Sequence, residues 1–177
     1  MRIISGEFKG RRFSPPGNLP IRPTTDQAKE ALFNIFNNNF EFDGLAVLDL
    51  FSGSGSITFE FASRGVSNLT CVEQNFKCCE FIKSTAGVLG ISPQVIKADV
   101  FQWAQQNTNR KFDLIFADPP YDLDNLKDLP KLIFDAGILK EEGWLIVEHP
   151  KEISFKDEAH FGWHRVYGHV NFSMFSL

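Results

Sequence analysis

The chain has 177 residues, of which 43% are hydrophobic and 23% charged, so its composition is that of one globular domain rather than a disordered, fibrous or coiled-coil protein. Its apolar stretches are far shorter than the roughly 18 residues of a membrane span, and the N-terminus has no signal-peptide pattern. We therefore expect a cytoplasmic, monomeric protein without membrane contact. The three cysteines, Cys71, Cys78 and Cys79, suit neither a disulfide framework nor a zinc site, and no metal is expected.

The net charge of −4 hides an uneven distribution along the chain. Residues 1–22 hold five basic side chains against Glu7 alone, a charge of +4, so residues 23–177 carry −8. A basic arm on an acidic body favours a polyanionic partner contacted through the arm. The charge by itself is equally compatible with a solvated turn that has no partner.

The first 36 residues are expected to form this arm and one helix. Glycines punctuate the apolar residues of segment 2–13, which is typical of a short hairpin. Segment 14–23 contains four prolines and is expected to be an extended connector. Thr24 or Thr25 can cap a helix that ends near residue 36. Because residues 1–23 are too few to fold alone, we expect one domain at 24–177 that carries the arm.

From residue 45 the pattern alternates between strands and helices. We expect strands at 46–51, 69–73, 95–98, 112–117 and 144–148, and helices at 57–63, 75–89, 100–106 and 125–136, the last with a break at Pro130. Two aromatic-rich strands follow at 163–168 and 170–175 with no helix between them. These units predict an α/β, Rossmann-like fold: a mostly parallel seven-stranded sheet with a C-terminal antiparallel hairpin at its edge.

Polar residues lie at the carboxyl ends of these strands, where open α/β sheets bind ligands. Asp49 precedes a Gly-Ser-Gly turn at 53–55, whose glycines let backbone N–H groups approach a ligand. Glu73 can accept both hydroxyls of a ribose, and Asp99 can accept a hydrogen bond from an adenine amino group. The third glycine of the dinucleotide fingerprint and the P-loop lysine are both missing. The set therefore favours a nucleoside without phosphate.

The fourth strand ends in the run Asp118-Pro119-Pro120-Tyr121. Two consecutive prolines remove two donors and fix the backbone, leaving carbonyl acceptors beside a carboxylate and a flat ring. Such a group can accept hydrogen bonds from an NH₂ group while the ring stacks on the base that carries it. At the end of a central strand, this run favours an amine-binding site over a merely stiffened loop.

The runs Asp49-Leu50-Phe51-Ser52-Gly53-Ser54-Gly55 and Asp118-Pro119-Pro120-Tyr121 resemble those of class I S-adenosylmethionine-dependent amino methyltransferases. The runs Arg2-Ile3-Ile4-Ser5-Gly6, Lys9-Gly10-Arg11-Arg12 and Arg22-Pro23-Thr24-Thr25-Asp26 narrow the resemblance to the bacterial RsmD family. That resemblance implies methylation of the N2 amine of a guanine in small-subunit (16S) rRNA. The family often has arginines after Thr25, where this chain has Gln27 and Lys29, and the loss of an arginine fork weakens any anion contact at position 27.

The resemblance also implies roles for individual residues. Asp118 and the Pro119 carbonyl would hold the amine hydrogens, and Tyr121 would stack on a flipped base. The implied cofactor-binding residues are Asp49, Phe51, Gly53, Ser54, Gly55, Glu73, Asp99, Val100 and Asp118, and the implied catalytic residues are Asp118, Pro119, Pro120 and Tyr121. The implied RNA contacts are Arg2, Lys9, Arg11, Arg12, Arg22, Thr24 and Thr25.

Two alternatives stay open at this level. An amino methyltransferase acting on adenine in nucleic acid, or on a protein glutamine amide, would present an NH₂ group to the same loop. A non-catalytic RNA-binding factor of ribosome assembly could keep the fold, although a pure binder has no need of both the glycine turn and the proline run. The expected partner is small-subunit rRNA, either naked or within a 30S assembly particle.

Overall fold

The computed structural model describes residues 1–17, 19 and 24–177, so the predicted contact of Arg22 and part of the proline-rich connector lie outside the described residues. Strands in the described part form a seven-stranded sheet in the order β3-β2-β1-β4-β5-β7-β6. The first five strands pair in parallel, and β7 pairs antiparallel with both β5 and β6. The strands are β1 (Ala46–Leu50), β2 (Asn68–Glu73), β3 (Gln94–Lys97), β4 (Phe112–Ala117), β5 (Leu139–His149), β6 (Phe161–Tyr167) and β7 (Val170–Ser176). The predicted fold class is confirmed.

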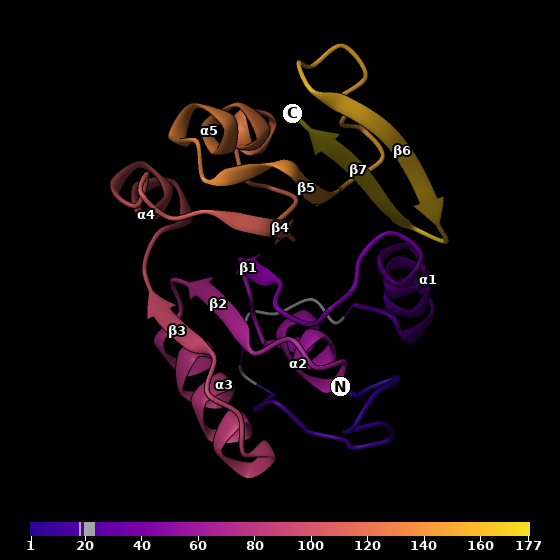
Figure 1. Ribbon diagram of the computed structural model, residues 1–177, viewed down its shortest axis with the longest axis vertical. Helices are drawn as coiled ribbons and strands as arrows, with labels where there is room; N and C mark the ends of the chain where they lie inside the picture. The colour runs from indigo at the N-terminus through magenta and orange to yellow at the C-terminus, as the bar shows by residue number, and fades with distance from the viewer. Residues whose placement is uncertain (18, 20–23) are drawn as a thin grey trace.

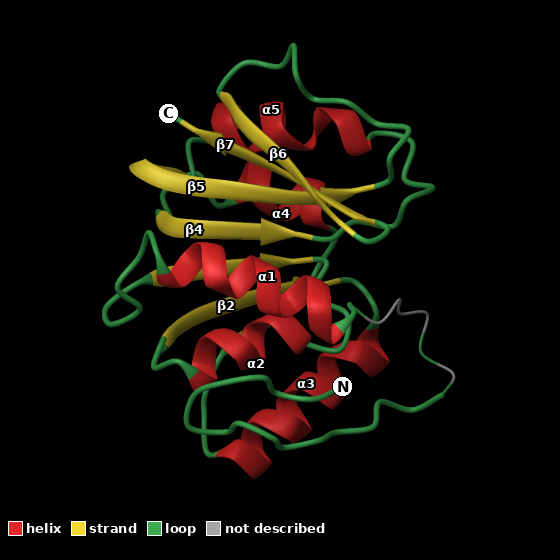
Figure 2. Ribbon diagram, turned by 90° about the vertical axis from the view of Figure 1, so that its right-hand side faces the viewer, coloured by secondary structure: helices red, strands yellow, loops and turns green. Residues whose placement is uncertain are grey.

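Helices cover both faces of the sheet (Figures 1 and 2). On one face, α4 and α5 pack through Trp103, Leu129 and Ile133. On the other lie α1, α2 and α3 with the N-terminal arm, which packs on α2 and α3 through the buried Ile3. The helices are α1 (Asp26–Asn37), α2 (Ser56–Ser63), α3 (Phe76–Leu89), α4 (Val100–Gln106) and α5 (Leu129–Ala136), with a 3₁₀ turn at Leu126–Asp128 before α5. Within the described residues, no helix is long and apolar enough to cross a membrane.

Short polar side chains start three of these helices, as expected of N-caps. The Thr25 hydroxyl accepts from the Ala28 N–H at 3.2 Å. The Asn75 side chain accepts from two N–H groups at the start of α3, and Asp99 accepts from the Gln102 N–H at 3.0 Å at the start of α4. Thr25 and Asp99 each use a side-chain oxygen to accept a hydrogen bond from the helix that follows. Both residues therefore have structural roles that do not depend on a ligand.

Three predicted details differ from the structure. Pro130 lies in the first turn of α5, where its missing N–H costs nothing, so it begins the helix instead of breaking it. Strand β5 begins at Leu139, five residues before the predicted start, and its register with β4 shifts near Phe112. Segment 2–13 pairs its two ends antiparallel, as expected of a hairpin, through the Arg2–Arg12 bridge and the bond from the Ile3 N–H to the Arg11 carbonyl, but it forms no regular strand.

The C-terminal hairpin lies at the sheet edge as predicted, with its second strand on the inside. Strand β7 buries five consecutive residues, including Phe172 and Phe175, whereas β6 is mostly exposed or half-buried. The strand that is buried on both faces therefore takes the position between two neighbours, and the more exposed strand forms the edge.

Candidate active site

The sheet order reverses between β1 and β4, because β2 and β3 follow on one side of β1 and β4 and β5 lie on the other. A cavity of about 820 Å³ opens at the carboxyl ends of these two strands, within the size range of cofactor and ligand sites. Sequence reasoning predicted nine of its lining residues as catalytic or cofactor-binding: Asp49, Phe51, Gly53, Ser54, Glu73, Asp118, Pro119, Pro120 and Tyr121. Thr24, predicted as an RNA contact, also lines it.

Left-handed backbone shapes the glycine loop between β1 and α2. Gly53 and Gly55 have φ values of 53° and 75°, and Phe51 adopts φ 57° despite its side chain. A Cβ atom at Gly55 would lie 2.9 Å from the Phe59 ring, so the loop is tight at that position. Left-handed backbone at a non-glycine residue costs free energy and gathers at ligand-binding loops. These φ values turn the chain sharply from the end of β1 into α2, and contact of the loop backbone with a cofactor stays a prediction.

Glu73 holds this loop from the end of β2. One carboxylate oxygen accepts from the Gly53 N–H at 2.9 Å, and the other accepts from the Asn75 N–H at 2.7 Å. Each carboxylate oxygen has capacity for a second hydrogen bond, so Glu73 can still accept the two hydroxyls of a ribose. The backbone contacts fix the direction in which those acceptors point.

Asp49 is buried beneath the loop, with 2% of its surface exposed. One carboxylate oxygen accepts from the Thr58 hydroxyl at 2.5 Å and from the Thr58 N–H at 3.1 Å, which ties β1 to the first turns of α2. Burial raises the pKa of Asp49 to about 7; the Thr58 hydrogen bonds oppose that rise, and the charge of Glu73 adds to it.

The run Asp118–Tyr121 forms the opposite wall of the cavity. The Asp118 N–H donates to the Leu50 carbonyl at 3.4 Å, which extends the β1–β4 pairing to the first residue of the run. The Tyr121 hydroxyl donates to a carboxylate oxygen of Glu148 at 3.2 Å, and Glu148 is buried at the end of β5. The run is thus anchored at both ends to neighbouring strands.

The residues present fit a nucleoside-containing cofactor. Gly53 and Ser54 of the glycine loop, the Glu73 carboxylate and the Asp118–Tyr121 run line one cavity, whereas Gly55 lies outside its lining. Asp99 and Val100 are absent from its lining; Asp99 is exposed, and its contact with an adenine stays a prediction.

The predicted RNA contacts divide into two groups. Lys9, Arg11 and Arg12 are exposed on the arm, outside the cavity lining. Arg2 instead pairs with Asp26 of α1 at 2.9 Å, and Thr25 caps that helix, so both also have structural roles.

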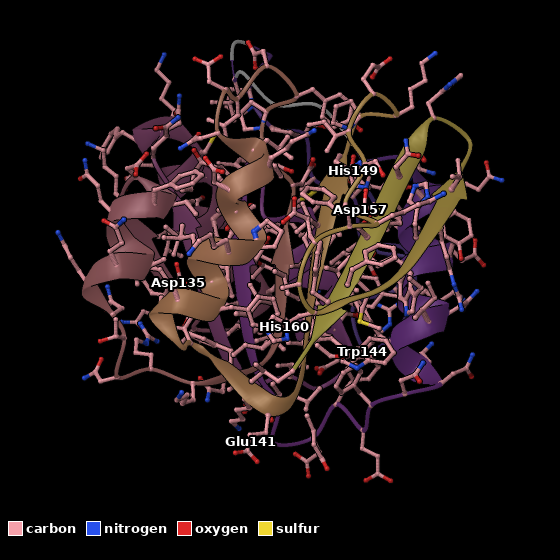
Figure 3. The ribbon with its side chains drawn as sticks, turned by 90° about the horizontal axis from the view of Figure 1, so that it is seen from above. Asp135, Glu141, Trp144, His149, Asp157 and His160 are labelled. Carbon is pink, nitrogen blue, oxygen red and sulfur yellow. The ribbon has the colours of Figure 1, made fainter. Side chains whose placement is uncertain are left out.

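No group of three or more metal-ligating side chains occurs among the residues described. The two histidines labelled in Figure 3, His149 and His160, lie at separate places. His149 contacts the Ser173 hydroxyl at 2.8 Å and the Pro150 carbonyl at 3.0 Å, while the His160 ring stacks on Phe134. These contacts give both histidines a structural role in packing.

Sequence reasoning missed two buried charged residues near the cavity. Lys29 lines the cavity, and Glu148 lies behind Tyr121. A signal for Lys29 was present, since it shares the apolar face of α1 with Leu32, Phe33 and Phe36 at helical spacing. The sequence gives no comparable signal for Glu148, because acidic residues at strand ends are usually solvated. Its contact with Tyr121 arises only from the packing of β5 beside β4.

Comparison with known proteins places the chain in a family. Residues 1–176 match the family model described as conserved hypothetical protein 95. YlbH of Bacillus subtilis, provisionally named an rRNA methyltransferase, is 37% identical, with 89% of this chain and 86% of that protein covered. The ribosomal RNA small subunit methyltransferase D of Buchnera aphidicola subsp. Baizongia pistaciae is 33% identical, with 87% and 78% covered.

A solved structure from Escherichia coli, provisionally described as a methyltransferase, superimposes with a TM-score of 0.85 at 26% identity and covers 99% of this chain and 96% of that one. The match of the family model over nearly the whole sequence, together with relatives that carry the methyltransferase D name, confirms the resemblance drawn from the motifs. The chain belongs to the conserved hypothetical protein 95 family, which is the RsmD family.

Proposed function

We propose that this chain transfers a methyl group from S-adenosylmethionine to the N2 amine of a guanine in small-subunit rRNA. The observation that carries the proposal is that one cavity is lined both by the glycine loop with Glu73 and by the Asp118–Tyr121 run. A cofactor held by the first set would meet an amine held by the second. The names of the relatives support rRNA as the substrate class.

S-adenosylmethionine supplies an electrophilic methyl group on a sulfonium ion. The chain's own residues would bind its ribose at Glu73 and its methionyl end at the loop from Asp49 to Gly55. The N2 lone pair of guanine is delocalised into the ring, so the amine is a poor nucleophile. Asp118 and the Pro119 carbonyl would accept hydrogen bonds from its two N–H groups. These bonds would orient the lone pair and stabilise the positive charge that develops on nitrogen.

Tyr121 would stack on the flipped guanine from the same side of the cavity. Its ring is held by the bond to Glu148, so it is pre-oriented before the base arrives. Lys9, Arg11 and Arg12 would contact phosphates outside the cavity, and Thr24 would lie beside the base. We further propose that the domain acts as a cytoplasmic monomer, on naked rRNA or on a 30S assembly particle.

Labelled S-adenosylmethionine tests the substrate. The protein is incubated with naked 16S rRNA, 30S particles, DNA or a glutamine-containing peptide, and labelled RNA is digested to nucleosides. We expect label in rRNA as N2-methylguanosine. Label in adenine or in the peptide would replace guanine as the target, and cofactor binding without transfer to any of the four would contradict the enzymatic proposal.

Asp118→Ala tests the mechanism. We expect kcat to fall at least about a hundredfold, because an acceptor for the developing charge is lost. The dissociation constant of S-adenosylmethionine, measured by calorimetry, should stay within about threefold, since Asp118 is only one of the implied cofactor contacts and the others, Glu73 and the glycine loop, are intact. Asp124→Ala removes an exposed carboxylate of the same loop and is the matched control. Near-normal turnover of Asp118→Ala would remove Asp118 from the mechanism.

A further inference from the structure

A buried ammonium group joins three parts of the molecule beside the cavity. Lys29 of α1 is 2% exposed, and its Nζ lies 2.5 Å from the Arg2 carbonyl oxygen, 3.1 Å from the Ser56 hydroxyl and 3.0 Å from a carboxylate oxygen of Glu60. Three acceptors match the three hydrogens of an ammonium group. Each hydrogen of the Lys29 ammonium group therefore has an acceptor: one on the arm, one at the start of α2 and one in the middle of α2.

Glu60 completes this arrangement. The carboxylate oxygen that faces Lys29 also accepts from the Ile4 N–H at 2.7 Å, and the other oxygen pairs with Arg64. The Arg64 guanidinium in turn lies 4.2 Å from the centre of the Phe33 ring. Glu60 consequently keeps a cationic partner even where Lys29 is replaced.

The arm docks along α2 at a second point. The Ser63 hydroxyl donates to the Ser5 carbonyl at 2.5 Å and accepts from the Phe8 N–H at 2.9 Å. Gly6 makes the close approach possible, because a Cβ there would lie 1.8 Å from the Ser63 carbonyl oxygen. The arm is thus fixed to α2 near both ends of that helix, in contrast to a mobile tether.

The contact with Ser56 reaches the cofactor loop. Ser56 is the first residue of α2 and follows Gly55 directly, and both Ser56 and Lys29 line the cavity. A shift of the arm at Arg2 is therefore transmitted to the first turn of α2 through one side chain. An ion pair buried so deeply is weak evidence for stability, since apolar side chains often do as well, which favours a role in geometry.

We propose that Lys29 is a positioning residue that fixes the basic arm relative to the glycine loop, so that RNA held on the arm presents its target base to the cofactor. The proposal rests on the proposed function. An arm that keeps its charges but loses its orientation still binds RNA, whereas the base no longer arrives in line with the methyl donor. Small misplacements of reacting groups have large effects on rate.

Lys29→Met tests this role, because methionine fills similar space without a charge and Glu60 keeps Arg64. We expect at least a tenfold fall in kcat on rRNA, with the dissociation constant for rRNA within threefold of wild type. Amide exchange of residues 1–13, measured without RNA or cofactor, should rise. Lys29→Arg restores a donor and should recover most of kcat. Lys83→Met, which removes the exposed partner of Glu80 on α3, is the matched control.

A folded Lys29→Met protein with wild-type kcat, or with unchanged exchange of residues 1–13, would overturn the proposal. Should Lys29→Met fail to fold, Ser56→Ala removes one acceptor and no charge, and is expected to lower kcat about threefold; no fall would overturn the proposal equally. Because exchange needs neither substrate, it tests the fixing of the arm even if the wild-type chain proves inactive on rRNA. That inactivity would contradict the proposed function separately.

Discussion

Asp49 shows how one buried acid can couple the cofactor loop to pH. Its pKa is raised to about 7, chiefly by burial, while the Thr58 bonds favour the ionised form. Below about pH 4 the carboxyl group is neutral in the folded and the unfolded chain. Between about pH 4 and 7 only the unfolded chain ionises, so the free energy of unfolding falls as pH rises through this window and levels off above it.

Asp49→Asn isolates this contribution, because the amide oxygen can still accept from Thr58. We expect the wild-type free energy of unfolding, measured in urea, to fall relative to that of Asp49→Asn by on the order of 3 kcal/mol between about pH 4 and 7. Asp135→Asn, on the exposed face of α5, controls for a general loss of charge. A difference between wild type and Asp49→Asn that does not change with pH would show that Asp49 ionises normally.

A hydrogen bond between Tyr121 and Glu148 holds the Tyr121 ring in place. Their bond of 3.2 Å lies at the edge of the cavity, and Glu148 is 1% exposed. We expect Glu148→Leu to lower kcat about tenfold by releasing the ring, whereas Glu148→Gln should keep most activity because its amide oxygen still accepts from the hydroxyl.

Tyr121→Phe completes a double-mutant cycle on turnover with rRNA. If Glu148 acts through Tyr121, the double variant Tyr121→Phe/Glu148→Leu loses no more activity than the more impaired single variant. Additive losses, or a Glu148→Gln protein as impaired as Glu148→Leu, would show that Glu148 acts on the substrate by another route.

At the scale of elements, local signals predicted the sheet and most of the helices. Strands β1 and β4 are short, mostly apolar runs, and α3 is preceded by the capping Asn75 and followed by Gly90, whose φ is 71°. Such signals act within a few residues and are readable in the sequence. Pro130 was misread because a proline suits the first turn of a helix as well as it breaks the interior, and only tertiary packing decides which.

The arm shows the limit of the same reasoning. Its glycines predicted the antiparallel pairing of its two ends, but they did not predict the contacts that hold Ile3 and Ile4 to α2 and α3, far away in sequence. Gly6 is needed for its approach to Ser63, which no local pattern reveals. The same limit applies to the site. The glycine loop, Glu73 and the proline run could be predicted because they lie at the ends of predicted strands. The positions of Lys29 and Glu148 could not, because they depend on which elements pack together in the fold.

At the scale of the whole molecule, the uneven charge takes on a structural meaning. The net charge of −4 combines +4 in residues 1–22 with an acidic remainder, and residues 4–8 of the arm hydrogen-bond to Glu60 and Ser63 of α2. Arg2 is exposed but pairs with Asp26, and Lys9, Arg11 and Arg12 are the other exposed cations among the described residues of the arm. An acidic body repels RNA except at this arm, which favours one orientation of approach.

This orientation predicts a particular salt dependence. Removing two phosphate contacts by Arg11→Ala/Arg12→Ala should weaken rRNA binding and reduce the slope of log affinity against log salt by about 1.5, because fewer counterions are released. Lys111→Ala/Lys140→Ala removes the same charge near the starts of β4 and β5, at the sheet end opposite the cavity, and should leave that slope unchanged. Equal effects of the two double variants would mean that RNA senses only net charge. An unchanged slope in Arg11→Ala/Arg12→Ala would show that RNA contacts another part of the molecule.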